Sequence, residues 1–379
     1  MLSLTLVLYA LGRFSSPALA GWVAFAAVAP GLMISPLAGA VLDRIGSGAA
    51  VTIDMTVSAA LMFCLIAADQ LGWASPVVLL TLVSLLSLTS PLSTAGVRVL
   101  LPRLVTPAAY DRVNALDTAA FAIVEVVGPA IAGLLVGLAG SRYALGAVAF
   151  VFGSAAVCIA QVRRLPSLSA SRRSLIHDML EGVAIVARQP TLRGLAVSYS
   201  LYQVTWGILV IVVPVFVTRH FADGQGKSVA GLMWAAMGLA GGIGALVAGR
   251  LRTAGRERPV MAIGMLVTAL AAWPIAAEFG LGGVVIGLML AGLVAGPIDV
   301  GLLTLRQRRT DPAQLGRALS VSISLNMAGF PLGSALAGMV ITHSLAATFV
   351  LAGLSSLLAA IAVAVIPQDR LRFVQPSAS

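Results

Sequence analysis

Apolar runs of about 20 residues recur along the whole chain, and they constrain its fold more than any other feature. A helix of about 20 residues crosses the hydrocarbon core of a bilayer, which is roughly 30 Å thick. The chain is also 59% hydrophobic and only 10% charged, far from the balance of about 45–50% and about 25% in soluble domains. We therefore expect an all-α membrane protein. The eleven runs expected to span the membrane are 19–41, 50–68, 74–97, 114–139, 142–160, 194–218, 229–250, 259–277, 281–305, 317–342 and 345–366.

The first apolar segment, MLSLTLVLYALG, is too short to span a bilayer unaided. Arg13 follows it, and no lysine or arginine precedes it as a signal peptide would require. We interpret residues 1–12 as the outer part of a first helix whose beginning is missing, which would make twelve spans. The alternative is an eleven-span protein with a short re-entrant start.

Basic residues are divided unevenly between the two sets of loops. One side of the membrane receives 20 of the 24 lysines and arginines, and Arg13, Arg142, Arg219 and Lys227 fall opposite. Cytoplasmic loops carry the excess of basic residues, so we predict a cytoplasmic carboxyl terminus. The net charge of +10 then reflects topology and contact with anionic lipid, and it does not indicate a nucleic-acid partner.

The longest polar interruption divides the chain into two halves. We expect an N-terminal bundle over 1–165, a cytoplasmic linker with an amphipathic helix over 166–193, and a C-terminal bundle with a short tail over 194–379. A shift of 205 residues aligns PAAYDR with PAQLGR and GPAIAG with GSALAG. An internal repeat of this kind is the usual construction of secondary transporters.

The loop PLAGAVLDRIGS joins two expected spans and carries Gly39, Asp43, Arg44 and Gly46. Charges at such a junction can hold a helix end in one conformation and release it in another. The loop resembles the cytoplasmic signature G-x-x-x-D-R-x-G-R of the major facilitator superfamily, with Ser47 in place of the last basic residue. The resemblance implies a conformational gate here.

The segment GPAIAG, with Gly128, Pro129 and Gly133, is similar to the exporter signature G-P-x-x-G-G of the same superfamily, with Ala132 replacing one glycine. Small residues let membrane helices pack closely, and proline bends a helix. Together with the loops LPRLVTPAAYDRVNALD and TLRQRRTDPAQLGRA, these motifs resemble the drug:proton antiporter subgroup that includes macrolide-efflux proteins and the enterobactin exporter. The resemblance covers nearly the full chain and implies two six-helix bundles related by pseudo-two-fold symmetry.

Two acids lie where a charge is costly and therefore suggest a function. Glu125 is near mid-membrane in its span, and Asp299 lies beside Pro297 in a later one. We expect both to be candidates for proton coupling. The structural alternative for Glu125 is a partner role toward Asn326 or an arginine. Two further acids, Asp54 and Asp117, are expected to pair with Arg98 and Arg112.

The span over 194–218 carries the densest polar and aromatic group. Tyr199, Tyr202, Gln203 and Trp206 follow i, i+3, i+4, i+7 spacing and share one helix face. An outward-facing glutamine is unfavourable in lipid, so this face should line a substrate cavity, with Asn326 of the span over 317–342 beside it. The alternative is helix packing with interfacial aromatic residues.

Other chemistry has little support in the sequence. Cys64 and Cys158 lie in different apolar runs, and the three histidines are far apart, so neither a metal site nor a cofactor is expected. The segment ADGQGKS lacks the first glycine of a phosphate-binding loop. We expect no enzymatic activity.

These observations lead to one expected function with two alternatives. We expect a monomeric multi-pass transporter of a bacterial cell membrane that exports a hydrophobic or amphiphilic small molecule in exchange for protons. The alternatives are uptake by symport and a non-transporting scaffold or sensor. The superfamily uses one fold for many ligands, so the sequence leaves the substrate open.

Overall fold

The structure is a computed structural model that describes residues 1–104, 110–162, 183–221, 225–250, 256–272, 277–310 and 315–368. Within these ranges the chain is helical and contains no strand. The N-terminal helices are α1 (Leu2–Phe14), α2 (Pro17–Ala26), α3 (Ala29–Ile45), α4 (Ser47–Gln70), α5 (Pro76–Leu104), α6 (Tyr110–Leu138) and α7 (Ser141–Ala160). The C-terminal helices are α9 (Pro190–His220), α10 (Gly226–Arg250), α11 (Glu257–Ala271), α13 (Gly280–Arg309), α14 (Leu315–Met327), α15 (Gly329–Val340) and α16 (Leu345–Ala362).

The expected spans all fall on helices. Nine helices in the described ranges are long and apolar enough to cross a membrane, and two shorter apolar helices, Leu2–Phe14 and Val126–Leu138, accompany them. The run over 259–277 falls on α11, which ends at Ala271, just before residues 273–276, which lie outside the description. The linker's amphipathic helix also falls largely outside, with only 183–188 described, as helix.

Two of the expected spans are each divided into two helices. The run over 19–41 breaks between α2 and α3, where Pro30 lies at the start of α3. The run over 317–342 breaks between α14 and α15 at Ala328, three residues before Pro331. Proline lacks the amide hydrogen that continues a helix, and it clashes with the preceding turn.

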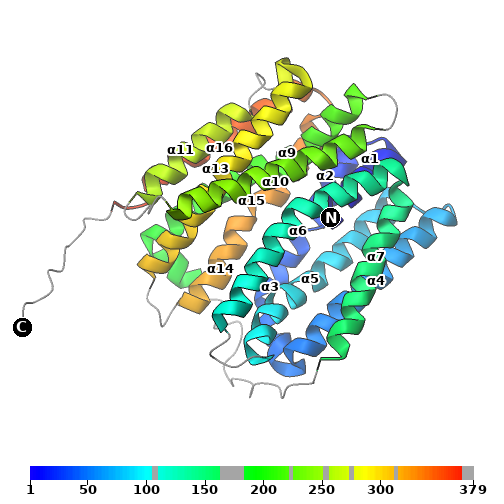
Figure 1. The fold of residues 1–379 in the computed structure, drawn as a ribbon, viewed down its shortest axis with the longest axis horizontal. Helices are drawn as coiled ribbons and strands as arrows, with labels where there is room; N and C mark the ends of the chain where they lie inside the picture. Colours follow the sequence, from blue (N-terminus) through cyan, green and yellow to red (C-terminus); the bar gives the residue numbers. More distant parts are fainter. Residues whose placement is uncertain are drawn as a thin grey trace, which may run out of the picture.

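The helices run roughly parallel to one another and end at two opposite ends of the bundle (Figure 1). At one end Arg13 forms an ion pair with Asp69 at 2.9 Å, and the Tyr9 hydroxyl donates to the same carboxylate at 3.0 Å. At the other end Arg308 pairs with Glu257 at 3.0 Å. We call these the arginine-poor end and the arginine-rich end.

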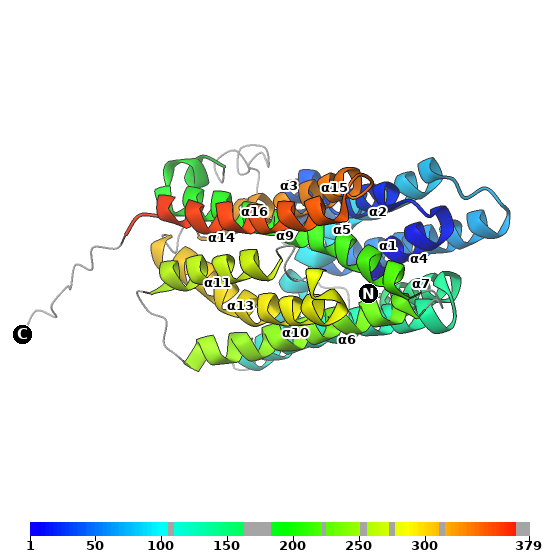
Figure 2. The ribbon, with the colours of Figure 1, turned by 90° about the horizontal axis from the view of Figure 1, so that it is seen from above.

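The two halves meet along two pairs of helices. α6 packs on α10, and α2 packs on α15. Figure 2 shows α6 and α10 side by side on one face of the bundle, with α2 and α15 on the opposite face. Each pair joins a helix of the N-terminal half to one of the C-terminal half.

Glycines bring the backbones together at both of these crossings. A Cβ on Gly133 of α6 would lie 2.5 Å from the Cα of Gly231 on α10, and a Cβ on Gly21 of α2 would lie 2.7 Å from the Cα of Gly338 on α15. The 205-residue shift aligns Gly133 with Gly338. The repeat therefore places a glycine crossing at the same position in each half, as the expected pseudo-two-fold symmetry requires.

A second aligned pair of glycines packs within the halves. A Cβ on Gly128 would lie 2.9 Å from the amino nitrogen of Met1 in the N-terminal half. A Cβ on Gly333 would lie 2.1 Å from the carbonyl oxygen of Val204 on α9 in the C-terminal half. In each half the glycine thus touches the first helical segment of that half.

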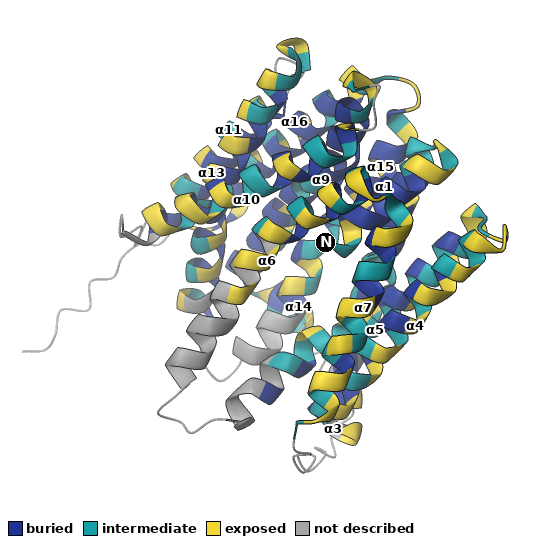
Figure 3. Ribbon diagram, turned by 45° about the vertical axis from the view of Figure 1, so that its right-hand side comes forward, coloured by how far each residue is buried: buried dark blue, intermediate teal, exposed yellow. Residues whose placement is uncertain are grey.

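The outer surface of the bundle is apolar. Many large hydrophobic side chains are exposed, among them Leu138, Phe150 and Leu246, and exposed positions recur along the outer helices (Figure 3). A soluble monomer rarely exposes a large contiguous apolar surface. The helices satisfy their own backbone hydrogen bonds, so this surface suits a bilayer.

Candidate functional site

The aromatic residues of α9 form a continuous series along its inner side. The rings of Tyr199 and Tyr202 have centroids 5.8 Å apart, and those of Tyr202 and Trp206 are 6.0 Å apart. Trp206 in turn lies 6.2 Å from Trp234 on α10. Tyr202 is enclosed in the core with its hydroxyl 3.5 Å from that of Thr268, whereas Trp206 is half-buried. Expected cavity residues thus extend from the core of the C-terminal half to its edge.

Asp299 is joined to this series. Its carboxylate accepts a hydrogen bond of 2.6 Å from the Tyr199 hydroxyl, which links α13 to α9. Asp299 is exposed, while Tyr199 is buried. A tyrosine hydroxyl stabilises the ionised form of a carboxylate.

Arg306 completes the group, although its position near the end of an apolar run assigns it only to the arginines of one membrane side. It is 4% exposed and lies two turns beyond Asp299 on the same face of α13, because seven residues make about two helical turns. With the Asn326 amide oriented so that both its groups are satisfied, Nη2 of Arg306 donates to the side-chain oxygen of Asn326 on α14, and the amide nitrogen donates to the Ser322 carbonyl at 3.1 Å. The spacing of seven residues between Asp299 and Arg306 was the sequence signal that could have placed Arg306 on the same helix face.

Gln203 and Ser324 extend the polar group toward the other half. The Gln203 amide lies 3.1 Å from the sulfur of Met327 on α14. The hydroxyls of Ser324 on α14 and Ser35 on α3 are 3.0 Å apart. The second contact links the two halves.

The N-terminal candidates are described only in part. Asp43, Asp117 and Glu125 lie on α3 and α6, but their side chains are outside the described residues. Gly39 is within α3, exposed Arg44 is in its last turn, and Gly46 ends it with a φ of 83°. Such a φ favours glycine.

Asp54 has partners other than those expected. Its side chain is 1% exposed and accepts hydrogen bonds from the hydroxyls of Ser93 and, at 3.4 Å, Ser58. The side chains of the expected partners, Arg98 and Arg112, lie outside the described residues.

The exporter-like segment lies at a crossing between halves. Gly128, Pro129 and Gly133 are all in α6, and a Cβ on Gly231 of α10 would meet the Pro129 carbonyl oxygen at 2.6 Å. The backbones of α6 and α10 are therefore close at Pro129 and Gly133.

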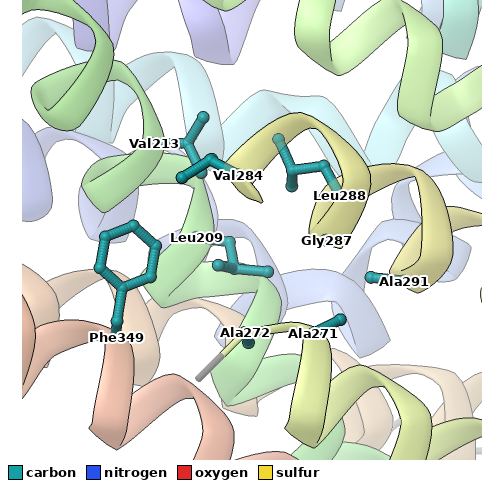
Figure 4. A pocket seen from close by; sticks show the side chains of 9 residues that line it. All are labelled: Leu209, Val213, Ala271, Ala272, Val284, Gly287, Leu288, Ala291 and Phe349. Atoms are coloured by element: carbon teal, nitrogen blue, oxygen red, sulfur yellow. The ribbon is translucent and has the colours of Figure 1, made fainter. Parts of the chain in front are cut away.

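A small pocket inside the C-terminal half has a different character (Figure 4). Side chains from α9, α11, α13 and α16 surround it, all of them hydrocarbon. They are Leu209, Val213, Ala271, Ala272, Val284, Leu288, Ala291 and Phe349, with Gly287 beside them. None of the candidate residues lines this pocket, which offers a polar ligand nothing to bind.

Metal binding has no basis in the part of the chain that the structure describes. There, no group of three or more histidine, cysteine, aspartate or glutamate side chains could hold an ion. Cys64 and Cys158 are both exposed and free, on α4 and α7.

Comparisons with known proteins agree with this architecture. Residues 1–251 and 195–376 match the family model of the Major Facilitator Superfamily. The chain is 60% identical over 369 residues to the uncharacterized MFS-type transporter y4rN of Sinorhizobium fredii, covering 97% of this chain and 91% of that protein. It is 28% identical over 345 residues to the multidrug efflux pump Tap of Mycobacterium tuberculosis, covering 86% and 80%. A mutant of the nucleoside transporter NupG shares the fold, with a TM-score of 0.77 at 16% identity over 96% of this chain and 94% of that one.

Proposed function

Since the chain belongs to the major facilitator superfamily, whose members are membrane transporters and not enzymes, we propose that it exports a hydrophobic or amphiphilic small molecule in exchange for protons. The two halves would rock about the glycine crossings, exposing the site to one side of the membrane and then to the other. The name of the 28% identical relative, a multidrug efflux pump, supports export. So does the resemblance of GPAIAG to the exporter signature.

The hydrogen bond between Tyr199 and Asp299 is the observation on which this proposal depends most. An acid within membrane helices is costly and suggests an ion pathway or a ligand site. Asp299 is accessible and tied to α9 at the start of the aromatic series. We assign it to proton coupling, and Glu125 of α6 remains the second candidate.

The substrate would bind along α9. Tyr199, Gln203 and Trp206 offer aromatic surface and an amide, while Tyr202 supports the rings from within the core. Asn326 of α14 adds to the polar groups near α9 because its side chain contacts Arg306. Aromatic walls with a few polar groups are the usual lining of a small-molecule site.

The remaining assignments concern the gate and the placement of the protein. Gly39, Asp43 and Arg44, which were expected in a loop, lie within α3, and Gly46 lies at its end. We assign this end of α3 to a gate at the arginine-rich end. The uneven distribution of basic residues supports our proposal that this end and the carboxyl terminus lie in the cytoplasm of a bacterial cell. We propose that the transporter works as a monomer.

Accumulation of fluorescent amphiphilic dyes in bacterial cells that express the chain tests this function. Expression should lower accumulation of at least one dye, and a protonophore should abolish the effect. The Asp299→Asn variant and the Glu125→Gln variant should each lose protonophore-sensitive export. The Asp69→Asn variant should keep it, because Asp69 pairs with Arg13 at the arginine-poor end.

Three results would contradict the proposal. Unchanged accumulation of every dye on expression would exclude export of such compounds, and raised accumulation would indicate uptake. Full gradient-driven export by both acid variants would remove the coupling assignment, even if export itself stands.

A further inference from the structure

Arg306 is a buried cation that has no anionic partner among the described residues. Its side chain is 4% exposed, and among the described residues no carboxylate lies within ion-pair distance of it. Its Nη2 donates to the neutral amide of Asn326, and its Nε has no partner. Arg308, two residues along α13, pairs with Glu257 instead. A buried guanidinium with only a neutral partner retains an unfavourable, uncompensated charge.

We propose that Arg306 is a binding subsite for the ionised acidic group of the transported amphiphile. The inference rests on the proposed transport function and adds a substrate class to it. A guanidinium presents several donors in a planar fork that matches a carboxylate, and Nε is one of those donors. A ligand carboxylate would neutralise this charge, for which the described residues supply no anion.

A second buried polar group without a partner among the described residues lies on α14. Ser322 is fully buried, and its hydroxyl has no partner among the described residues. It precedes Asn326 by one helical turn, and its carbonyl accepts from the Asn326 amide. α13 and α14 therefore each carry a buried hydrogen-bonding group without a partner among the described residues, the Arg306 Nε and the Ser322 hydroxyl. Buried polar groups in folded proteins normally have partners.

The surroundings of Arg306 define the rest of the ligand. Tyr199 begins the series of rings that continues to Trp206 and Trp234, and seven residues of α9 from Tyr199 to Trp206 rise about 10.5 Å. The buried indole nitrogen of Trp234 has no partner in the described structure. Asp299, of opposite charge, is two turns from Arg306. An aromatic amphiphile that carries both an acidic and a basic group matches this arrangement best.

Rhodamine B and its ethyl ester are suitable probes, because both carry the aromatic cation and only the acid carries a carboxylate. Binding to purified full-length protein in lipid nanodiscs is measured by fluorescence anisotropy without any ion gradient. Wild type should bind the acid at least about tenfold more tightly than the ester, since hydrogen bonds to charged groups give roughly 10- to 100-fold in affinity. The Arg306→Gln variant should bind both equally, with ester affinity unchanged.

Two matched variants keep the test independent of folding. The Asn326→Asp variant supplies Arg306 with an internal carboxylate, so it should lose the preference for the acid while the guanidinium stays in place. The Arg308→Gln variant, which removes an exposed arginine of the same helix, should keep the preference. Size-exclusion profiles and thermal unfolding report whether each variant is folded.

The inference is overturned if wild type binds acid and ester equally or binds neither. It is also overturned if Arg306→Gln weakens both probes alike, which would indicate a structural role. Because no gradient is applied, failed dye export with an intact acid preference would reject the transport proposal alone. Normal export with no acid preference would reject the subsite alone.

Discussion

An alanine at Gly133 should open the crossing between α6 and α10. The added Cβ would lie 2.5 Å from the Cα of Gly231 and 2.8 Å from the Lys227 carbonyl oxygen. Carbon atoms in contact prefer about 3.5–4.0 Å, so the two backbones must part by about 1 Å or more. Both obstacles are backbone atoms, which cannot rotate away as a side chain would.

The cost follows from this geometry. Overpacking in a close-packed interior costs about 1–3 kcal/mol. If the crossing is closed in only one of the two conformations of the transporter, the equilibrium between them shifts by about 5- to 150-fold. Alanine also favours helix over glycine by up to about 1 kcal/mol, but that effect is the same in both conformations. Gly242→Ala on α10 measures it alone, since no atom lies within 4 Å of its Cβ.

Spin-label distances report the shift. The free cysteines Cys64 and Cys158 are first replaced by serine. Spin labels are then attached to cysteines introduced at Arg142 and Phe279, which are exposed positions of the two halves near the arginine-poor end. Gly133→Ala should lengthen the distances relative to wild type, and Gly242→Ala should not. Identical distributions for all three proteins would show that the glycine crossing does not hold this end closed.

Two further substitutions test the packing and the arginine-poor end. Phe349→Ala enlarges the apolar pocket and removes the edge-to-face contact with Phe216, so the free energy of unfolding should fall by about 3–5 kcal/mol in a thermal unfolding assay. The control Phe150→Ala, at an exposed position, should change it little. Equal effects of the two substitutions would contradict the buried placement of Phe349. Asp69→Asn removes the ion pair with Arg13, whose side chain is 46% exposed. Exposed ion pairs contribute little, so the free energy of unfolding in the same assay should fall by less than about 1 kcal/mol. A larger fall would contradict the interpretation of this pair as exposed and weak.

The fold could be predicted from the sequence because the thickness of the bilayer sets both the length of a spanning helix and the length of the apolar run that forms it. The breaks at Ala27–Val28 and Ala328 were not predicted. Pro30 and Pro331 were visible as signals, but other prolines, such as Pro214 and Pro297, lie inside continuous helices. Which prolines end a helix depends on whether neighbouring helices satisfy the freed carbonyl groups, and that is a tertiary property.

The arrangement of the candidate residues could be predicted on α9 better than elsewhere, and their role stays a prediction. Helical spacing placed Tyr199, Tyr202 and Trp206 on one face, and the structure brings Asp299 to the same face. Arg306 was missed because charge counting assigns an arginine near a span end to a loop. Its burial depends on how α13 packs against α9 and α14, which no local pattern encodes.

The position of α9 has a consequence for how the protein is made. In its most apolar window 78% of α9 is enclosed by protein, against 22% to 44% for the other described spans. α9 is nevertheless as apolar as a lipid-facing helix. Hydrophobicity therefore drives its insertion into the bilayer, but it does not drive its association with other helices, because lipid tails are equally apolar. Close packing must drive this association instead. The Thr205 hydroxyl donates a hydrogen bond to the Ala352 carbonyl, and Gly207 packs against the backbone of Phe330. Biogenesis of the C-terminal half is therefore a two-stage process, in which α9 first enters the bilayer and later helices then displace the lipid around it.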